Sequence, residues 1–83
     1  MSNRAEEILK VGAVFGTDKK MKPVWFMWNR RRYEIKEITY SWMSREGRNA
    51  LYHFSVTDGN ALYELCYNSE SLNWMLTGIT DSE

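Results

Sequence analysis

The dipeptide Asp58-Gly59 restricts the fold more than any other feature, because it lies between two segments in which apolar residues alternate. Asp-Gly is favoured in two-residue hairpin loops, where both loop residues need a positive φ. With this loop, one face of the hairpin carries apolar pairs throughout: Val56 with Ala61, Phe54 with Tyr63, Tyr52 with Leu65, and Ala50 with Tyr67. A slip of one residue would mix this face with the polar one. We therefore predict a β-hairpin in this register.

The polar segment 68–71 predicts the turn into a further strand. Crossing this turn adds three pairs to the same apolar face: Tyr67 with Leu72, Leu65 with Trp74, and Tyr63 with Leu76. On the other side of the hairpin, Glu46-Gly47-Arg48 predicts the turn from the preceding strand. Three consecutive strands therefore share one core face.

A second hairpin is predicted upstream, with its turn at Asn29 and Arg30. Asn tolerates the left-handed conformation that such a turn needs. In this hairpin Phe26 pairs with Tyr33, and Val24 pairs with Ile35. Pro23 stands at the entrance of the first strand, where its missing N–H costs least.

The second strand of this hairpin is expected to run as far as Met43, and its apolar pattern changes parity between Ile35 and Ile38. Beyond that point Ile38, Tyr40 and Trp42 alternate. A β-bulge near Lys36-Glu37 would explain the change. A short helix is the alternative, because positions 35, 38 and 42 also fit helical spacing. We favour the strand, because Thr, Tyr and Trp suit a pleated surface.

Together these segments predict a mainly β fold, a five-stranded antiparallel meander from about Val24 to Ile79 that forms a curled sheet or a small open barrel. Residues 23–79 form the single domain, and residues 80–83 are a frayed tail. Residues 1–22 form an N-terminal segment with three alternatives: disorder, a short helix over 4–10, or an extra edge strand over 11–16. A polar loop is expected over 17–22.

Composition supports one small domain with an aromatic core. The 83 residues include four Trp, five Tyr and three Phe, which allow a short chain to bury a large apolar area. The single cysteine, Cys66, excludes an internal disulfide framework and predicts a reducing compartment. Glu6 and Glu7 interrupt any secretory signal, and no apolar run is long enough to span a membrane. We therefore expect a cytoplasmic protein without a membrane partner.

Charge is distributed unevenly, although the formal net charge is zero. One stretch of the chain carries seven cations with Glu34 as the only carboxylate among them: Lys19, Lys20, Lys22, Arg30, Arg31, Arg32 and Lys36. After Arg48 the chain has five acidic residues and neither Lys nor Arg. A basic surface attracts polyanions. The alternative is that the two halves lie together and neutralise each other.

The candidate ligand-binding residues are Arg30, Arg31, Arg32, Trp25, Lys19, Lys20 and Lys22. The cations would contact phosphate groups, and Trp25 would stack on a base if the outer face of its strand is open. The alternative is that Trp25 packs beneath the N-terminal segment or inside a homodimer.

No catalytic site, metal site or cofactor is predicted. His53 opposite Glu64 is the only acid–base pair that the register provides, and no nucleophile or pocket accompanies it. We expect a cross-strand contact on the surface. Cys66 is expected to act as a small apolar residue, and His53 and Cys66 alone do not make a metal site. The protein is therefore expected not to be an enzyme.

An aromatic pattern runs through two thirds of the chain. Its residues are Pro23, Phe26, Trp28, Arg31, Tyr33, Ile35, Ile38 and Trp42. This spacing resembles that of small bacterial proteins of unknown function with a Pro-x-x-Phe-x-Trp start, an Arg-x-Tyr-x-Val/Ile strand and a later Trp. The segment Tyr63-Glu64-Leu65, with Trp74 and Leu76, is similar to their second half. The chain departs from the pattern at Arg30, where many relatives carry a turn glycine.

Some of these relatives are encoded beside lesion-bypass polymerase genes, so the resemblance implies a DNA-linked context. The first functional hypothesis is a non-enzymatic module that binds nucleic acid or another polyanion through the basic hairpin. The alternative is a protein-interaction or self-associating domain that uses Trp25, Met27 and the strand edges.

Overall fold

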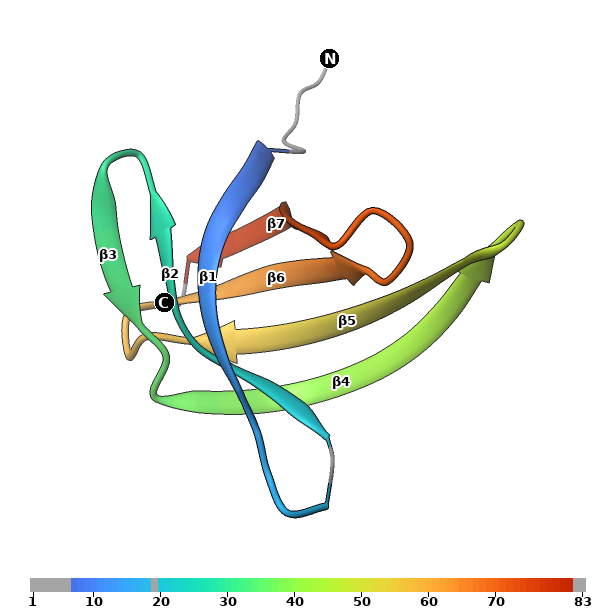
Figure 1. Cartoon of the computed structure of the whole chain (residues 1–83). Coiled ribbons are helices and arrows are strands. Elements are labelled where there is room, and N and C mark those ends of the chain that lie inside the picture. The colour runs from blue at the N-terminus through green and yellow to red at the C-terminus, as the bar shows by residue number, and fades with distance from the viewer. Residues whose placement is uncertain (1–6, 19, 82–83) are drawn as a thin grey trace.

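The computed structural model describes residues 7–18 and 20–81, and these form one antiparallel sheet (Figure 1). Its strands are β1 (Glu7–Phe15), β2 (Met21–Trp28), β3 (Arg31–Glu34), β4 (Glu37–Glu46), β5 (Asn49–Thr57), β6 (Ala61–Asn68) and β7 (Asn73–Asp81). The sheet curls into a half-barrel, in which β1 and β2 cross in front of the other strands. The predicted fold class, a mainly β domain with a curled antiparallel sheet, is confirmed.

The strand order is β3-β2-β1-β7-β6-β5-β4. The sheet therefore consists of two meanders, β1–β3 and β4–β7, which are joined where β1 pairs with β7. β1 pairs with β2 along most of its length and with β7 over Glu7–Leu9. The prediction of five strands in one continuous meander was therefore wrong in strand number and in order. The segment predicted as an edge strand is part of β1, which lies between β2 and β7 in the strand order: Lys10–Phe15 pair with β2, and Glu7–Leu9 pair with β7.

The helix predicted over 4–10 is not formed over Glu7–Lys10, which belongs to β1. The apolar residues Leu9 and Val11 alternate toward the core, and tertiary pairing on both sides overrides the weak helical signal of a short segment. Residues 1–6, on which the rest of that prediction and part of the predicted disorder fall, lie outside the described residues. The frayed tail predicted for 80–83 was wrong for residues 80 and 81, because β7 continues to Asp81, and residues 82–83 lie outside the described residues.

The upstream hairpin has the predicted register, because Phe26 faces Tyr33 and the Ile35 amide donates to the Val24 carbonyl. Its turn residues Asn29 and Arg30 have φ of 53° and 65°. Two consecutive positive φ values give the twist that a two-residue hairpin loop requires. The turn is thus formed as predicted, although an L-residue with a long side chain occupies its second position.

The long strand predicted from the turn to Met43 is divided into β3 and β4, which belong to opposite edges of the sheet. Ile35 still bonds to β2, whereas the Lys36 amide donates to Thr57 of β5. The chain therefore changes partner at the position where a bulge was predicted. A register shift does occur, but between Ile38 and Tyr40. It leaves Ile38 opposite the buried Val56 and places Tyr40 and Trp42 on the other face.

In the β5–β6 hairpin and in the β6–β7 hairpin from Leu65 onward, the predicted faces are formed but the register differs from the prediction by two residues. Before Leu65 a register shift between Glu64 and Leu65 makes the difference three residues, so Tyr63 faces Ile79 rather than Leu76. Tyr67 faces Tyr52 rather than Ala50, and it faces Trp74 rather than Leu72. A shift of two residues preserves which side chains share a face, so the alternating pattern does not detect it. The cause is turn length, since side-chain hydrogen bonds enlarge both turns.

In the first of these turns Asp58 Oδ1 accepts hydrogen bonds from the amides of Asn60 (2.9 Å) and Ala61 (3.1 Å). Only Gly59 has a positive φ, so the two-residue loop predicted from Asp-Gly does not form. In the second turn Asn68 Oδ1 accepts from the amides of Glu70 and Ser71 in the same way. The predicted turn at Glu46-Gly47-Arg48 is present, with Gly47 at φ 60°.

The core fills the concave side of the half-barrel. Its buried residues are Leu9, Phe26, Phe54, Val56, Ala61, Tyr63, Leu65, Trp74 and Leu76. Phe26 lies at its centre with no exposed surface, stacked on Tyr33 and in edge contact with Tyr63, each with a centroid distance of 5.1 Å. These rings connect the β2–β3 hairpin to β6, and aromatic pairs contribute about 0.5–1.5 kcal/mol each beyond their buried area.

We predict that Arg30→Gly raises the melting temperature by about 2–8 °C. Glycine removes the strain of a left-handed L-residue, about 1–2 kcal/mol, against an entropic loss of about 0.5–1 kcal/mol. Thermal unfolding followed by circular dichroism measures the shift. Arg31→Gly is the matched control, because Arg31 lies in β3 and this substitution should lower the melting temperature. A lower melting temperature for Arg30→Gly would contradict the strain argument.

We also predict that the Asp58 turn makes stability depend on acid pH. Partial desolvation acts to raise the pKa of Asp58, but hydrogen bonds from Asn60, Ala61 and Tyr63 outweigh it and hold the pKa below the ordinary 3.8. The resulting stabilisation is present above the unfolded-state pKa and is lost as pH falls through the folded-state value. Urea unfolding at several pH values should show a shallower acid dependence for Asp58→Asn. An unchanged dependence would show that the turn carboxylate does not contribute.

Candidate nucleic-acid interface

The three arginines of the basic hairpin point in different directions from one turn. Arg30 lies at the tip, where its backbone is left-handed and its side chain is exposed. The Arg31 guanidinium lies over the Tyr33 ring at 5.7 Å, whereas the Arg32 guanidinium lies over the Trp25 ring at 4.5 Å. Since neighbouring residues of a strand face opposite sides of the sheet, the hairpin is basic on both faces and at its tip.

The Trp25 indole lies flat against β1 at Gly12. A Cβ atom at Gly12 would overlap the indole nitrogen and ring carbons, so only glycine leaves room for this ring. Arg32 then covers the ring and forms an ion pair with Glu34, with Nε 2.6 Å from Oε2. Trp25 is half-buried as a result. It is therefore not the freely exposed stacking platform that one of the sequence alternatives described.

A further cation lies near Trp25 on the outer face of the unit formed by β1, β2 and β3. Lys10 faces Met27, and Met27 faces Arg32, so the three residues form one row across β1, β2 and β3. Cross-strand partners share a face. Lys10 was not among the sequence candidates, and it fell in the segment for which a short helix and disorder were left open. Its place in β1, two residues before Gly12, is what brings it to this face.

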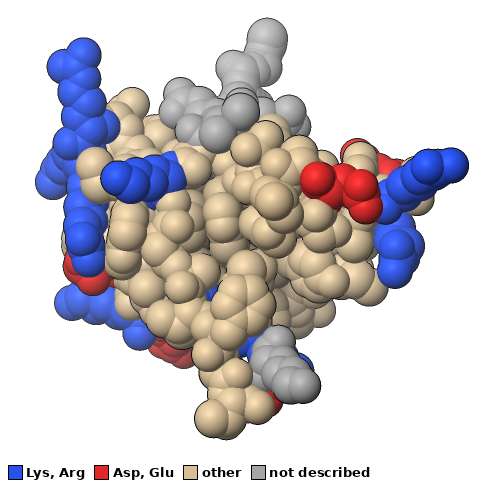
Figure 2. Space-filling model, in the orientation of Figure 1, with Lys and Arg blue, Asp and Glu red and all other residues tan. Residues whose placement is uncertain are grey.

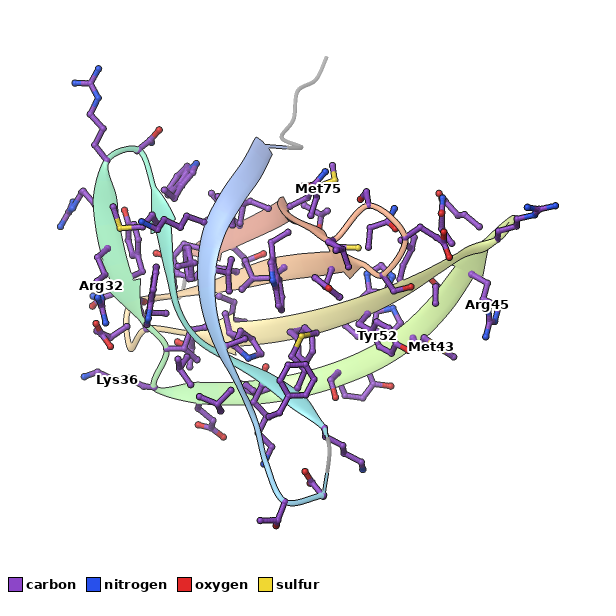
Figure 3. The ribbon with its side chains drawn as sticks, viewed as in Figure 1. Arg32, Lys36, Met43, Arg45, Tyr52 and Met75 are labelled. Carbon is purple, nitrogen blue, oxygen red and sulfur yellow. The ribbon has the colours of Figure 1, made fainter. Side chains whose placement is uncertain are left out.

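The predicted cationic residues separate into two groups. The arginines lie on the β2–β3 hairpin, whereas Lys20 and Lys22 line cavities between β2 and β4. Lys19 lies outside the described residues. Figure 2 shows Lys and Arg along the side of the molecule formed by the β2–β3 hairpin, and a second group at the β4–β5 turn beside acidic atoms. Figure 3 shows Arg32 on the first side and Arg45 near the second group.

A polar array on the convex face was only partly visible in the sequence. His53 faces Cys66, not Glu64, and Glu64 Oε2 lies 3.9 Å from His53 Nδ1. Ser44 Oγ lies 2.8 Å from His53 Nε2, and the imidazole stacks on Trp42 at 4.8 Å. Sequence reasoning missed Ser44, because only the register of β4 against β5 brings it near the imidazole.

This array contains a hydroxyl, an imidazole and a carboxylate, but its geometry does not orient the base. The 3.9 Å separation between Glu64 and Nδ1 exceeds the roughly 2.6–3.2 Å of a catalytic hydrogen bond, and Nδ1 is buried without a hydrogen-bond partner. Cys66 is buried nearby, as its expected apolar role would require. Among the described residues, no three His, Cys, Asp or Glu side chains are grouped so that they could hold a metal ion.

Comparisons with known proteins return no relative: no family model matches the chain, and no match is found among curated proteins or solved structures. Within residues 7–18 and 20–81, no helix is long and apolar enough to cross a membrane.

We predict that Gly12→Ala displaces the Trp25 indole and destabilises the domain by about 1–3 kcal/mol, the usual effect of overpacking. Urea unfolding measures the loss, and the indole N–H resonance of Trp25 reports the displacement. Gly78→Ala is the matched control, because a Cβ there would meet Glu64 at an ordinary 3.6 Å. A Trp25 resonance that does not move in Gly12→Ala would contradict the packing described for this site.

Proposed function

We propose that the protein is a non-enzymatic module that binds single-stranded nucleic acid through the β2–β3 hairpin. The observation that carries this proposal is the arrangement of three consecutive arginines at one turn, with the Arg32–Trp25 stack on the outer face and Lys10 in the same row. Phosphate contacts by such cations supply most sequence-independent affinity for nucleic acid.

The Arg32–Trp25 stack defines how a base would be received. A guanidinium plane supported by an indole offers a flat surface, and arginine planes stack on unpaired bases as aromatic rings do. Arg30 and Arg31 would then hold the phosphates on either side of the stacked base. The ion pair with Glu34 is exposed, so it is weak and does not prevent Arg32 from serving in this role.

The compartment and the type of nucleic acid follow as parts of the same proposal. A single buried cysteine supports a reducing cytoplasm. The resemblance to small bacterial proteins encoded beside lesion-bypass polymerase genes supports single-stranded DNA as the ligand. A binding role is also favoured over catalysis because the Ser44–His53–Glu64 array has no oriented base.

The test uses a fluorescein-labelled oligothymidylate and fluorescence anisotropy between about 20 and 200 mM salt. We predict that the affinity falls steeply as salt rises. The double variant Arg30→Ala with Arg31→Ala should reduce the slope of log K against log salt by about 1.4, because each single-strand phosphate contact contributes about 0.7.

The matched control is Arg45→Ala with Arg48→Ala, which removes two exposed arginines, one at the end of β4 and one in the turn that follows it. It should leave both affinity and salt slope unchanged. The absence of binding at low salt, or an equal loss in the control variant, would refute the proposal. Circular dichroism of each variant checks that the fold is retained.

A further inference from the structure

Two strand edges face an opening in the half-barrel. Among the described residues, β4 is the last strand of the sheet and pairs only with β5. β3 pairs with β2 over Trp25–Trp28, so the earlier part of β2, from Met21 to Pro23, has its described pairing on the β1 side only. Strand edges with unpaired backbone groups are templates for an added strand.

Two adjoining cavities occupy the space between these edges, with volumes of about 500 Å³ and 480 Å³. They share Lys20 and Met21 from the β1–β2 hairpin side, and Ser41 and Phe54 from the β4–β5 side. Because four residues line both cavities, they form one groove along β4. The β4 residues that line it, from Glu37 to Met43, extend over about 20 Å at the rise of a β-strand.

The walls of this groove are apolar and are open to solvent. Phe15, Met43 and Tyr52 line it with 71%, 50% and 39% of their surfaces exposed. Figure 3 shows Met43 and Tyr52 close together on β4 and β5, where they are cross-strand partners. Side chains that alternate inward from an added strand would cover this surface and complete the concave core.

The groove has an excess of positive charge, which favours an acidic partner. Lys20, Lys22 and Lys36 line it, with Glu37 as the one carboxylate among its described lining residues. Lys22 lies in β2, Lys20 directly precedes β2, and Lys36 directly precedes β4. A neutral or basic strand in the groove would leave these charges unopposed. A strand with acidic residues on its outward side would neutralise them.

We propose that this groove binds an extended acidic peptide, which adds as a strand between β2 and β4. Backbone hydrogen bonds to the β4 edge give affinity, apolar side chains fill the groove, and the lysines favour glutamate or aspartate at alternate positions. Arg30, Arg31 and Arg32, the arginine hairpin between β2 and β3, do not line the groove. The peptide site is therefore independent of nucleic-acid binding.

The test measures the anisotropy of a fluorescein-labelled peptide of alternating Glu and Val, seven residues long. Binding is expected. Two further forms of the peptide carry N-methyl groups on alternate nitrogens, one form for each edge of the peptide strand. The form whose methyl groups face β4 should bind at least tenfold more weakly, because N-methylation removes those backbone donors while leaving the side chains. A peptide with Lys in place of Glu should also bind at least tenfold more weakly. On the protein, Lys20→Glu with Lys22→Glu should weaken binding at least tenfold, whereas Lys10→Glu on the outer face should not.

Three outcomes would overturn the proposal. The first is equal binding of the acidic peptide and both N-methylated forms. The second is loss of peptide binding in Arg30→Ala with Arg31→Ala, or displacement of the peptide by oligothymidylate, since either would place the peptide on the arginine hairpin. The third is a dimer in sedimentation velocity that the peptide dissociates, since a second copy would then be the occupant. Because oligonucleotide affinity is measured separately on the same variants, failure here is distinguishable from failure of nucleic-acid binding.

Discussion

The rest of the structure depends on the aromatic contact between Phe26, Tyr33 and Tyr63. This contact joins the two meanders, β1–β3 and β4–β7. The only described backbone pairing between the meanders is that of β1 with β7 over Glu7–Leu9. Three residue pairs would leave the β1–β3 unit free to swing relative to the other strands. The Phe26 ring, fully buried against Tyr33 and Tyr63, holds the β2–β3 hairpin over β6. Through this contact the position of the arginine hairpin is determined by the core.

Alternation of apolar residues carries most of the information about this fold, and its limits explain what could not be predicted. The pattern has a period of two, so it distinguishes the faces of a strand but not registers that differ by two. Turn length decides between those registers. Here it depends on backbone amides that donate to the side chains of Asp58 and Asn68, which an Asp-Gly or Asn-Ser dipeptide does not reveal. The β2–β3 turn was predicted correctly from Asn29, which tolerates the left-handed conformation, and both Asn29 and Arg30 adopt that conformation in the two-residue loop.

The surroundings of the candidate site could not be predicted, because they depend on pairing between strands that are distant in the sequence. The arginines were evident as a cluster in the sequence, and their turn was correctly placed. The environment of Trp25 depends on Gly12, which lies in a strand that the sequence did not distinguish from a helix or a disordered segment. The cavities that Lys20 and Lys22 line between β2 and β4 likewise depend on the change of partner at Lys36, where the chain leaves β2 and joins β5. Neither event leaves a local signature, because each is decided by which distant strand offers an unpaired edge.

For the proposed binding role, the placement of the three arginines suits a linear ligand better than a small anion. A pocket for a single phosphate would direct its cations inward to one point, as paired donors do when they converge on an oxyanion. Here Arg31 is held over Tyr33 on one face, Arg32 is held over Trp25 on the other, and Arg30 lies at the tip between them. Each aromatic ring keeps a guanidinium on its own side of the sheet, which also separates like charges.

A flexible polyanion can follow the path from Arg31 through Arg30 to Arg32 around the hairpin, because its phosphates are spaced along a chain. The strained left-handed backbone at Arg30 places the middle cation of that path, and this gives a physical reason for arginine at a position where glycine would be less strained.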